Sequence, residues 1–145
     1  MPGPVAVNFV NETKLLVAPG MTGATGNIYT GLHEFQDMAF ALHVLRPNDL
    51  FVDIGANVGS YTVLAASVGA KSISVEPIKI AFDHLMRNIH LNGISDRVDA
   101  RNMASAPTEE VWSLLRDWIP LTTSSREIDK TDLPSARLKL TRLTT

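Results

Sequence analysis

The sequence predicts an α/β fold in which helices alternate with the strands of a parallel sheet, and three stretches carry that prediction. The first, Leu50–Ile54, is an apolar strand that leads into a glycine loop and then a helix. A second apolar strand at 72–76 ends in the acid Glu76, and a third, more polar strand follows at 98–102. Helical segments between such strands imply right-handed crossovers and parallel pairing.

Composition narrows the class of protein. The 145 residues suit one domain of ordinary size, and 45% hydrophobic residues are enough for a packed core. The net charge of −2, with no basic block, predicts a protein that binds neither nucleic acid nor membrane surfaces. The lack of cysteine excludes disulfides and Cys-ligated zinc, and we expect no metal site. With neither a signal peptide nor a membrane-length apolar run, a soluble cytoplasmic protein is expected.

The segment before the first central strand contains a predicted hairpin, a loop and a helix. Apolar runs at Val5–Phe9 and Leu15–Val17 predict the β-hairpin, and the Gly- and Thr-rich stretch from Pro19 to Gly31 predicts the loop. Residues 33–46 have helical periodicity, and Pro47 ends that helix. Its predicted buried stripe consists of Phe35, Met38, Ala39, Leu42 and Leu45.

Two more helices connect the predicted strands. Residues 61–68 form a short, mostly apolar helix that ends at Gly69. Pro77 is predicted to open the next helix, because proline suits a first helical turn, and Asn92-Gly93 closes it. Its predicted buried stripe consists of Ile78, Phe82, Leu85 and Ile89.

Three regions are expected along the chain. Residues 1–32 contain the N-terminal hairpin and loop, and residues 33–120 contain an α/β cofactor-binding domain. Residues 121–145 are rich in Thr and Ser and have no sustained period, so we expect a poorly ordered or loosely attached tail.

The loop after the first strand favours one cofactor over another. Strand, glycine loop and helix, with an acid ending the next strand, form the Rossmann-like arrangement that binds nucleotide cofactors. A dinucleotide loop needs a second glycine two residues after the first, but Asn57 occupies that position. Asp53 at the strand end would repel a pyrophosphate and attract an ammonium and a sulfonium. The loop therefore favours S-adenosylmethionine over NAD, and a nicotinamide-dependent oxidoreductase remains the weaker alternative.

These residues resemble a known family. The run Phe51-Val52-Asp53-Ile54-Gly55-Ala56-Asn57-Val58-Gly59-Ser60-Tyr61, then Val75-Glu76-Pro77, then 85–92, closely resembles the FkbM family of class I S-adenosylmethionine-dependent methyltransferases. The lead-in at 26–34 is also similar to that family, so the resemblance covers about residues 26–104. It implies a class I methyltransferase fold, of which these residues would supply the N-terminal half.

The resemblance implies roles by position. Residues Asp53, Gly55, Asn57 and Gly59 would line the methionine and ribose parts of the cofactor. Glu76 would accept hydrogen bonds from the ribose hydroxyls. The other implied cofactor contacts are Ala56, Tyr61, Pro77 and, near the adenine, Asn102. Glu34 and His33 are the candidate catalytic residues, because they lie at a helix start ahead of the first central strand.

The implied reaction is methyl transfer to a hydroxyl of a sugar or natural product, so the expected partner is a small-molecule acceptor. The resemblance stops after the third strand, where family members continue with a segment like Asp-x-x-Lys-x-Asp-x-Glu-Gly that this sequence lacks. Strand 50–54 would then keep an open edge, through which the chain could self-associate. A truncated, inactive cofactor-binding fragment is therefore the alternative to an active enzyme.

Overall fold

The computed structural model describes residues 3–18, 31–32 and 34–103. Their helices and strands, in chain order, are β1 (Val5–Asn8), the 3-10 helix η1 (Val10–Glu12), β2 (Lys14–Val17), α2 (Phe35–Val44), β3 (Leu50–Ile54), α3 (Ser60–Ser67), β4 (Lys71–Val75), α4 (Lys79–Leu91) and β5 (Val98–Arg101). The expected hairpin, the helix after it and the three strands that alternate with helices are all present. The second central strand begins and ends one residue earlier than predicted, and the third ends one residue earlier, which is within the usual variation of element limits.

The central sheet is parallel, with the strand order β3-β4-β5. In its register Asp53 lies beside Ser74, and Ser74 lies beside Ala100. The carboxyl ends of the three strands therefore meet at one edge of the sheet, where ligands of open α/β folds bind. Among the described residues, β4 is the one strand that pairs with β3.

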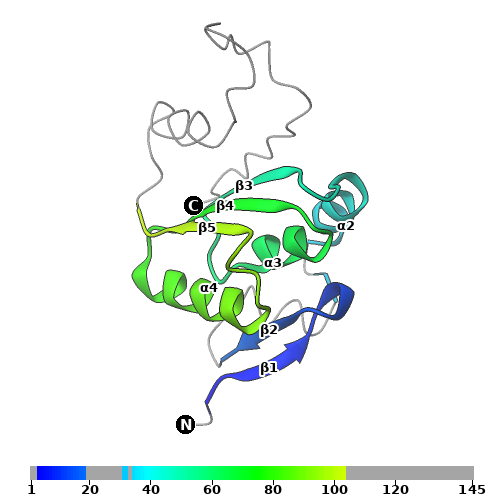
Figure 1. The fold of residues 1–145 in the computed structure, drawn as a ribbon. Helices are drawn as coiled ribbons and strands as arrows, with labels where there is room; N and C mark the ends of the chain where they lie inside the picture. The colour runs from blue at the N-terminus through cyan, green and yellow to red at the C-terminus, as the bar shows by residue number, and fades with distance from the viewer. Residues whose placement is uncertain (1–2, 19–30, 33, 104–145) are drawn as a thin grey trace, which may run out of the picture.

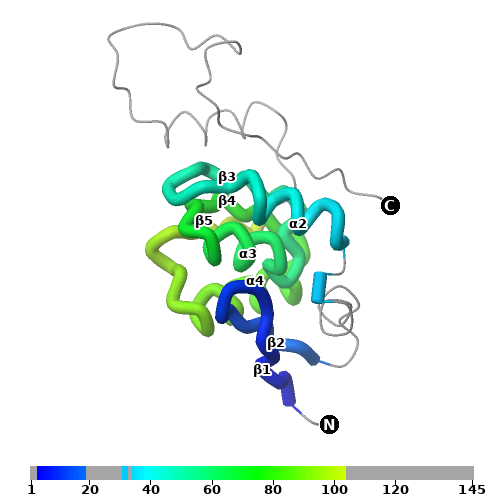
Figure 2. The backbone as a smooth tube through the Cα atoms, turned by 90° about the vertical axis from the view of Figure 1, so that its right-hand side faces the viewer, coloured from blue at the N-terminus to red at the C-terminus, as the bar shows by residue number. Residues whose placement is uncertain are grey.

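Helices α2, α3 and α4 gather on one side of this sheet (Figures 1 and 2). Phe51 of β3 packs there in a core cluster with Met38 of α2 and Leu64 of α3. Side chains of a strand alternate between its two faces, and Val52 accordingly packs with Ile73 and Val75 in a separate buried cluster. β3 is thus apolar on both faces, as expected for a strand of a parallel sheet.

The hairpin lies against α4 rather than beside the central sheet (Figure 1). Leu15 of β2 is 1% exposed and belongs to a core cluster with Ala56, Val63, Leu85 and Ile89. Ala56 is part of the glycine loop, so one hairpin side chain reaches the core directly beneath that loop. Burial of a leucine side chain contributes roughly 1.5–3 kcal/mol.

Three sequence-based expectations about helix burial and helix limits are wrong. Phe35 is 67% exposed, because it starts α2 and the buried stripe begins one turn later at Met38. Ile78 is 64% exposed, because it precedes the first turn of α4 instead of lying within the helix. For the same reason Pro77 does not open α4, which begins at Lys79.

The expected tail at 121–145 and most of the loop from Pro19 to Gly31 lie outside the described residues. The division of the chain into three regions therefore stays a prediction. Within the described part of the chain, every helix is too short or too polar to cross a membrane.

Candidate cofactor-binding site

The loop between β3 and α3 is held in a tight, left-handed path. Gly55, Asn57 and Gly59 all have positive φ angles, of 78°, 51° and 89°. Asparagine tolerates this region better than other residues with a side chain, which explains how Asn57 can stand between the glycines. The backbone N–H groups of Gly55 and Ala56 both donate to Val75 O of β4, at 2.8 and 3.0 Å. The loop is therefore anchored to the end of the neighbouring strand.

Glu76 is the second anchor of this loop. Its side chain is 4% exposed, and its Oε2 accepts a hydrogen bond from the backbone N–H of Asn57 at 2.7 Å. Its Oε1 accepts from the backbone N–H of Ile78 at 2.8 Å. A carboxylate has about four acceptor positions, so two remain for further donors such as hydroxyls. Glu76 thus fixes the loop and still has acceptor capacity for a ribose.

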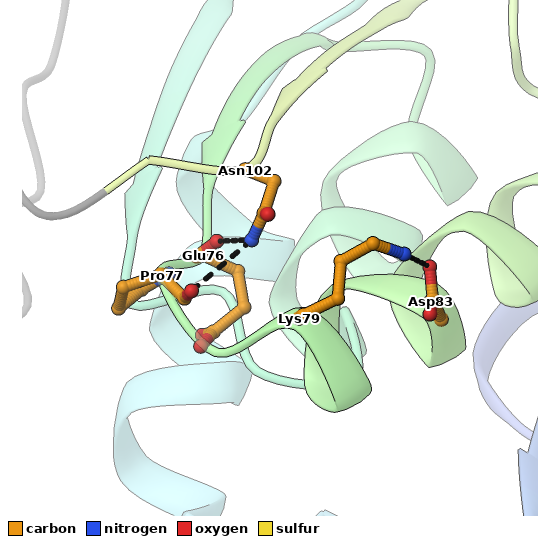
Figure 3. A network of polar contacts seen from close by, with 5 residues as sticks. All are labelled: Glu76, Pro77, Lys79, Asp83 and Asn102. Atoms are coloured by element: carbon orange, nitrogen blue, oxygen red, sulfur yellow. Dashed lines mark hydrogen bonds and ion pairs between the residues drawn. The ribbon is translucent and has the colours of Figure 1, made fainter.

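Asn102, the residue that follows β5, lies at the same corner (Figure 3). Its Nδ2 donates to the backbone oxygens of Glu76, at 2.8 Å, and Pro77, at 3.1 Å. The side chain joins the ends of β4 and β5 and fixes the backbone that carries Glu76. The predicted contact of Asn102 with adenine stays a prediction, and the structure adds this bracing role.

Asp53 is the end of a buried chain of hydroxyl groups. It is 4% exposed, and its Oδ2 accepts from Thr62 Oγ1 of α3 at 2.7 Å. Thr62 Oγ1 also lies 2.7 Å from Ser74 Oγ of β4. A hydroxyl has one hydrogen, and Thr62 uses it on Asp53, so Ser74 is the donor to Thr62. Thr62 and Ser74 are both 0% exposed, so this chain orients the Asp53 carboxylate without help from solvent.

Tyr61 joins the glycine loop to the start of α2. Its hydroxyl donates to Glu34 Oε2 at 2.5 Å, and its ring stacks on Phe51, with centroids 6.5 Å apart. Burial, the hydrogen bond to Glu34 and the charge of nearby carboxylates raise the pKa of Tyr61 far above its usual range. Those carboxylates belong to Glu34, Asp37 and Asp53. Tyr61 therefore stays a neutral hydrogen-bond donor even in alkaline solution.

The structure brings most of the predicted site residues to one edge of the sheet. Asp53, the loop and Glu76 lie at the carboxyl ends of β3 and β4, and Tyr61 brings Glu34 toward them. His33 lies outside the described residues. Sequence reasoning missed Thr62, Ser74 and Asn88, whose polar groups hold Asp53 and the loop. It also missed that Ile78 is exposed beside Glu76.

Gly59 provides a test of how tightly the loop is packed. A Cβ at this position would lie 2.5 Å from Leu85 Cδ1, and the φ of 89° is unfavourable for any side chain. We expect Gly59→Ala to lower the free energy of unfolding by about 2–4 kcal/mol, from backbone strain and overpacking together. Gly93→Ala is the matched control, because Gly93 also has a positive φ, of 63°, but open space around it. Urea unfolding followed by circular dichroism measures both; equal losses would contradict the tight contact with Leu85.

Comparisons with known proteins give relatives in sequence and a solved structure of the same fold. No family model matches the chain. The chain is 41% identical over 61 residues to tRNA(Phe) (4-demethylwyosine(37)-C(7)) aminocarboxypropyltransferase of Pyrococcus horikoshii. The aligned residues make up 41% of this chain and 22% of that protein. It is 33% identical over 95 residues to ribosomal protein L11 methyltransferase of Bacillus pumilus. These aligned residues make up 63% of this chain and 30% of that protein. The chain therefore spans between a fifth and a third of the length of these relatives.

A solved structure shows the same fold. The crystal structure of TYW2 from Pyrococcus horikoshii in complex with MeSAdo matches with a TM-score of 0.55 and 23% identity, over 74% of this chain and 39% of that chain. The predicted Rossmann-like α/β fold of class I methyltransferases is thus confirmed, with the described strands corresponding to its N-terminal half. Membership of the FkbM family is not supported by any of these matches.

The sequence-based expectation that nucleic acid is not a partner is wrong. A relative that is 41% identical over its aligned part is named for the modification of tRNA(Phe). The expectation was based on a net charge of −2 and the lack of a basic block. The residues that align with this relative correspond to 22% of its length, and phosphate contacts need not lie in the part that binds the cofactor. A weakly acidic chain is therefore compatible with a nucleic-acid acceptor, and the expected small-molecule hydroxyl acceptor has no support among these relatives.

Proposed function

We propose that this chain binds S-adenosylmethionine and belongs to an enzyme that transfers a group from it, methyl in the first instance. One observation carries the proposal: two buried carboxylates, Asp53 and Glu76, flank a glycine loop at the carboxyl ends of adjacent strands. The sulfonium and ammonium of S-adenosylmethionine are attracted by such a site, whereas the pyrophosphate of a dinucleotide is repelled. The relatives named as transferases support the same conclusion.

The residues present fit this cofactor. Glu76 has acceptor capacity left for the ribose hydroxyls, and the glycines at 55 and 59 allow the backbone to approach a ligand closely. Asp53 is held in one orientation by Thr62, so its charge is fixed in place before binding. Exposed Ile78, directly after Pro77, offers an apolar surface at the same corner. We assign the predicted contacts of Ala56, Asn57, Tyr61 and Asn102 to this site as well.

The chemistry is an alkyl transfer, for which the bound sulfonium supplies an electrophilic carbon. The protein's part is to orient the acceptor and to exclude water. Glu34 is our candidate for a group that contacts the acceptor or its proton; in this structure it accepts the Tyr61 hydroxyl. A carboxylate has about four acceptor positions, so Glu34 can keep this hydrogen bond and still accept one from the acceptor.

A second candidate is transfer of the aminocarboxypropyl group, which a relative's name favours. The two reactions leave different by-products, because a nucleophile that attacks the methyl carbon releases S-adenosylhomocysteine. Attack on the aminocarboxypropyl carbon releases 5′-methylthioadenosine instead. The by-product therefore distinguishes the two reactions without knowledge of the acceptor.

The test starts with isothermal titration of the chain with S-adenosylmethionine, S-adenosylhomocysteine and NADH. We expect the two sulfur compounds to bind with Kd in about the micromolar range, and NADH to bind at least about 100-fold more weakly. Asp53→Asn removes the buried charge while keeping its shape, and it should weaken binding of S-adenosylmethionine more than that of uncharged 5′-methylthioadenosine. Tight NADH binding, or no binding by well-folded protein, would overturn the proposal.

For the acceptor class, we propose tRNA, on the strength of the relative named for its modification. Incubation with labelled S-adenosylmethionine and bulk tRNA should label the RNA and produce one of the two by-products. Label in ribosomal protein instead would favour the function named for the other relative. Binding without transfer to either would favour the inactive-fragment alternative. The cytoplasmic location stays a prediction that fits both acceptors.

A further inference from the structure

Asn88 of α4 connects the N-terminal hairpin to the cofactor loop. It is 0% exposed, and its Nδ2 donates to the backbone oxygen of Val58 at 2.7 Å. Its Oδ1 accepts from the backbone N–H of Leu16, in β2, at 2.7 Å. One amide therefore holds two segments that lie 30 and 72 residues away from it in the sequence.

The contact with Val58 O fixes the peptide unit between Val58 and Gly59. Glycine can adopt many backbone angles at little steric cost, so Gly59 itself restrains the orientation of this peptide little. The Gly59 N–H of the same peptide donates to Ala56 O at 2.8 Å. Rotation of the peptide would break both hydrogen bonds and leave the buried Nδ2 of Asn88 without its acceptor, which is unfavourable.

Leu85, one turn before Asn88 on α4, supports the same loop by contact. A Cβ at Gly59 would lie 2.5 Å from its Cδ1, so helix and loop are closely packed there. Together with Glu76, which accepts the Asn57 N–H, these side chains hold residues 57, 58 and 59 in succession. The path of the loop is thus determined by side chains outside it.

The other half of the Asn88 amide depends on the hairpin. Asn92, which caps the C-terminal end of α4, binds the same strand edge. Its Oδ1 accepts from Lys14 N and its Nδ2 donates to Lys14 O, both at 2.8 Å. Asn88 and Asn92 therefore pair with alternate residues of β2, much as another strand would. They differ in one respect, since Asn88 contacts the cofactor loop and the contacts of Asn92 are with Lys14 and α4.

We infer that Asn88 is a positioning residue for cofactor binding, and that hairpin β1–β2 stabilises the cofactor loop through it. This inference builds on the proposed function. An amide suits the position because it must donate to Val58 O and accept from Leu16 N at once. Alanine can do neither, and aspartate, of the same shape, can accept but not donate while ionised.

The test compares Asn88→Ala with Asn92→Ala in the full chain. Hydrogen–deuterium exchange, measured without ligand, follows peptides that cover residues 55–60 and, as an internal reference, β4. We expect Asn88→Ala to speed exchange in the loop roughly tenfold relative to β4, and Asn92→Ala to change that ratio by less than about twofold. Titration with S-adenosylhomocysteine should show about tenfold weaker binding for Asn88→Ala alone.

The outcomes separate this inference from the proposed function. Equal loop exchange in the two variants, or a rise of equal size in β4, would overturn the positioning role, because a general loss of stability affects the whole domain. Faster loop exchange in a protein whose parent binds no S-adenosylhomocysteine would support the role of Asn88 in loop order and overturn the proposed function alone. If Asn88→Ala does not fold, Asn88→Asp takes its place, with the same expected pattern.

Discussion

Replacing Glu76 with alanine is expected to abolish cofactor binding and to lower the free energy of unfolding by about 1–3 kcal/mol. The carboxylate is buried and accepts hydrogen bonds from the backbone N–H groups of Asn57 and Ile78. Alanine leaves both donors without this partner, so the loop loses an anchor and the proposed ribose contact is lost with it. We expect affinity for S-adenosylmethionine to fall at least about 100-fold, measured by calorimetric titration.

Glu76→Gln and Asp83→Ala define the controls for this prediction. Glutamine has the same length but one acceptor oxygen, so it can satisfy one of the two N–H groups, and we expect an intermediate loss of stability. Asp83 is an acid of α4 that forms an exposed ion pair with Lys79 (Figure 3). Its replacement should change stability by less than about 1 kcal/mol and leave binding unchanged. Binding by Glu76→Ala at wild-type affinity would show that the carboxylate does not contact the cofactor.

The arrangement of strands and loop was predictable because it depends on local patterns. Apolar runs of strand length marked β3 and β4, and the glycines marked the turn between β3 and α3. Parallel pairing then requires that acids at strand ends, here Asp53 and Glu76, meet at one edge of the sheet. The site could therefore be predicted from positions within short stretches of sequence.

The supports of the site were not predictable in the same way. Asn88 lies in a helix where asparagine usually indicates an exposed position, and its partners are 30 and 72 residues away. Thr62 and Ser74 are small polar residues within apolar runs, and neither pattern reveals that their hydroxyls face each other across β4 and α3. The exposure of Phe35 and Ile78 was missed because helical periodicity says nothing about where a helix begins.

The buried hydroxyl chain leads to the second large effect. Thr62→Val keeps the shape of the side chain but removes the donor to Asp53 and the acceptor of Ser74. We expect the free energy of unfolding to fall by about 1.5–3 kcal/mol, because a hydrogen bond to a buried charged group is lost. Affinity for S-adenosylmethionine should fall about tenfold, since Asp53 loses one of the contacts that orient it.

Ser74→Ala tests whether the three groups act as one chain. The Ser74 hydroxyl donates to Thr62 and not to Asp53, so its loss should lower the free energy of unfolding by only about 0.5–1.5 kcal/mol. In the Thr62→Val background the Ser74 hydroxyl has already lost its acceptor, and removing it should then be neutral or stabilising. The double variant should therefore be at least as stable as Thr62→Val alone. Strictly additive losses would show that Ser74 and Thr62 act independently, and the proposed chain from Ser74 through Thr62 to Asp53 would be wrong.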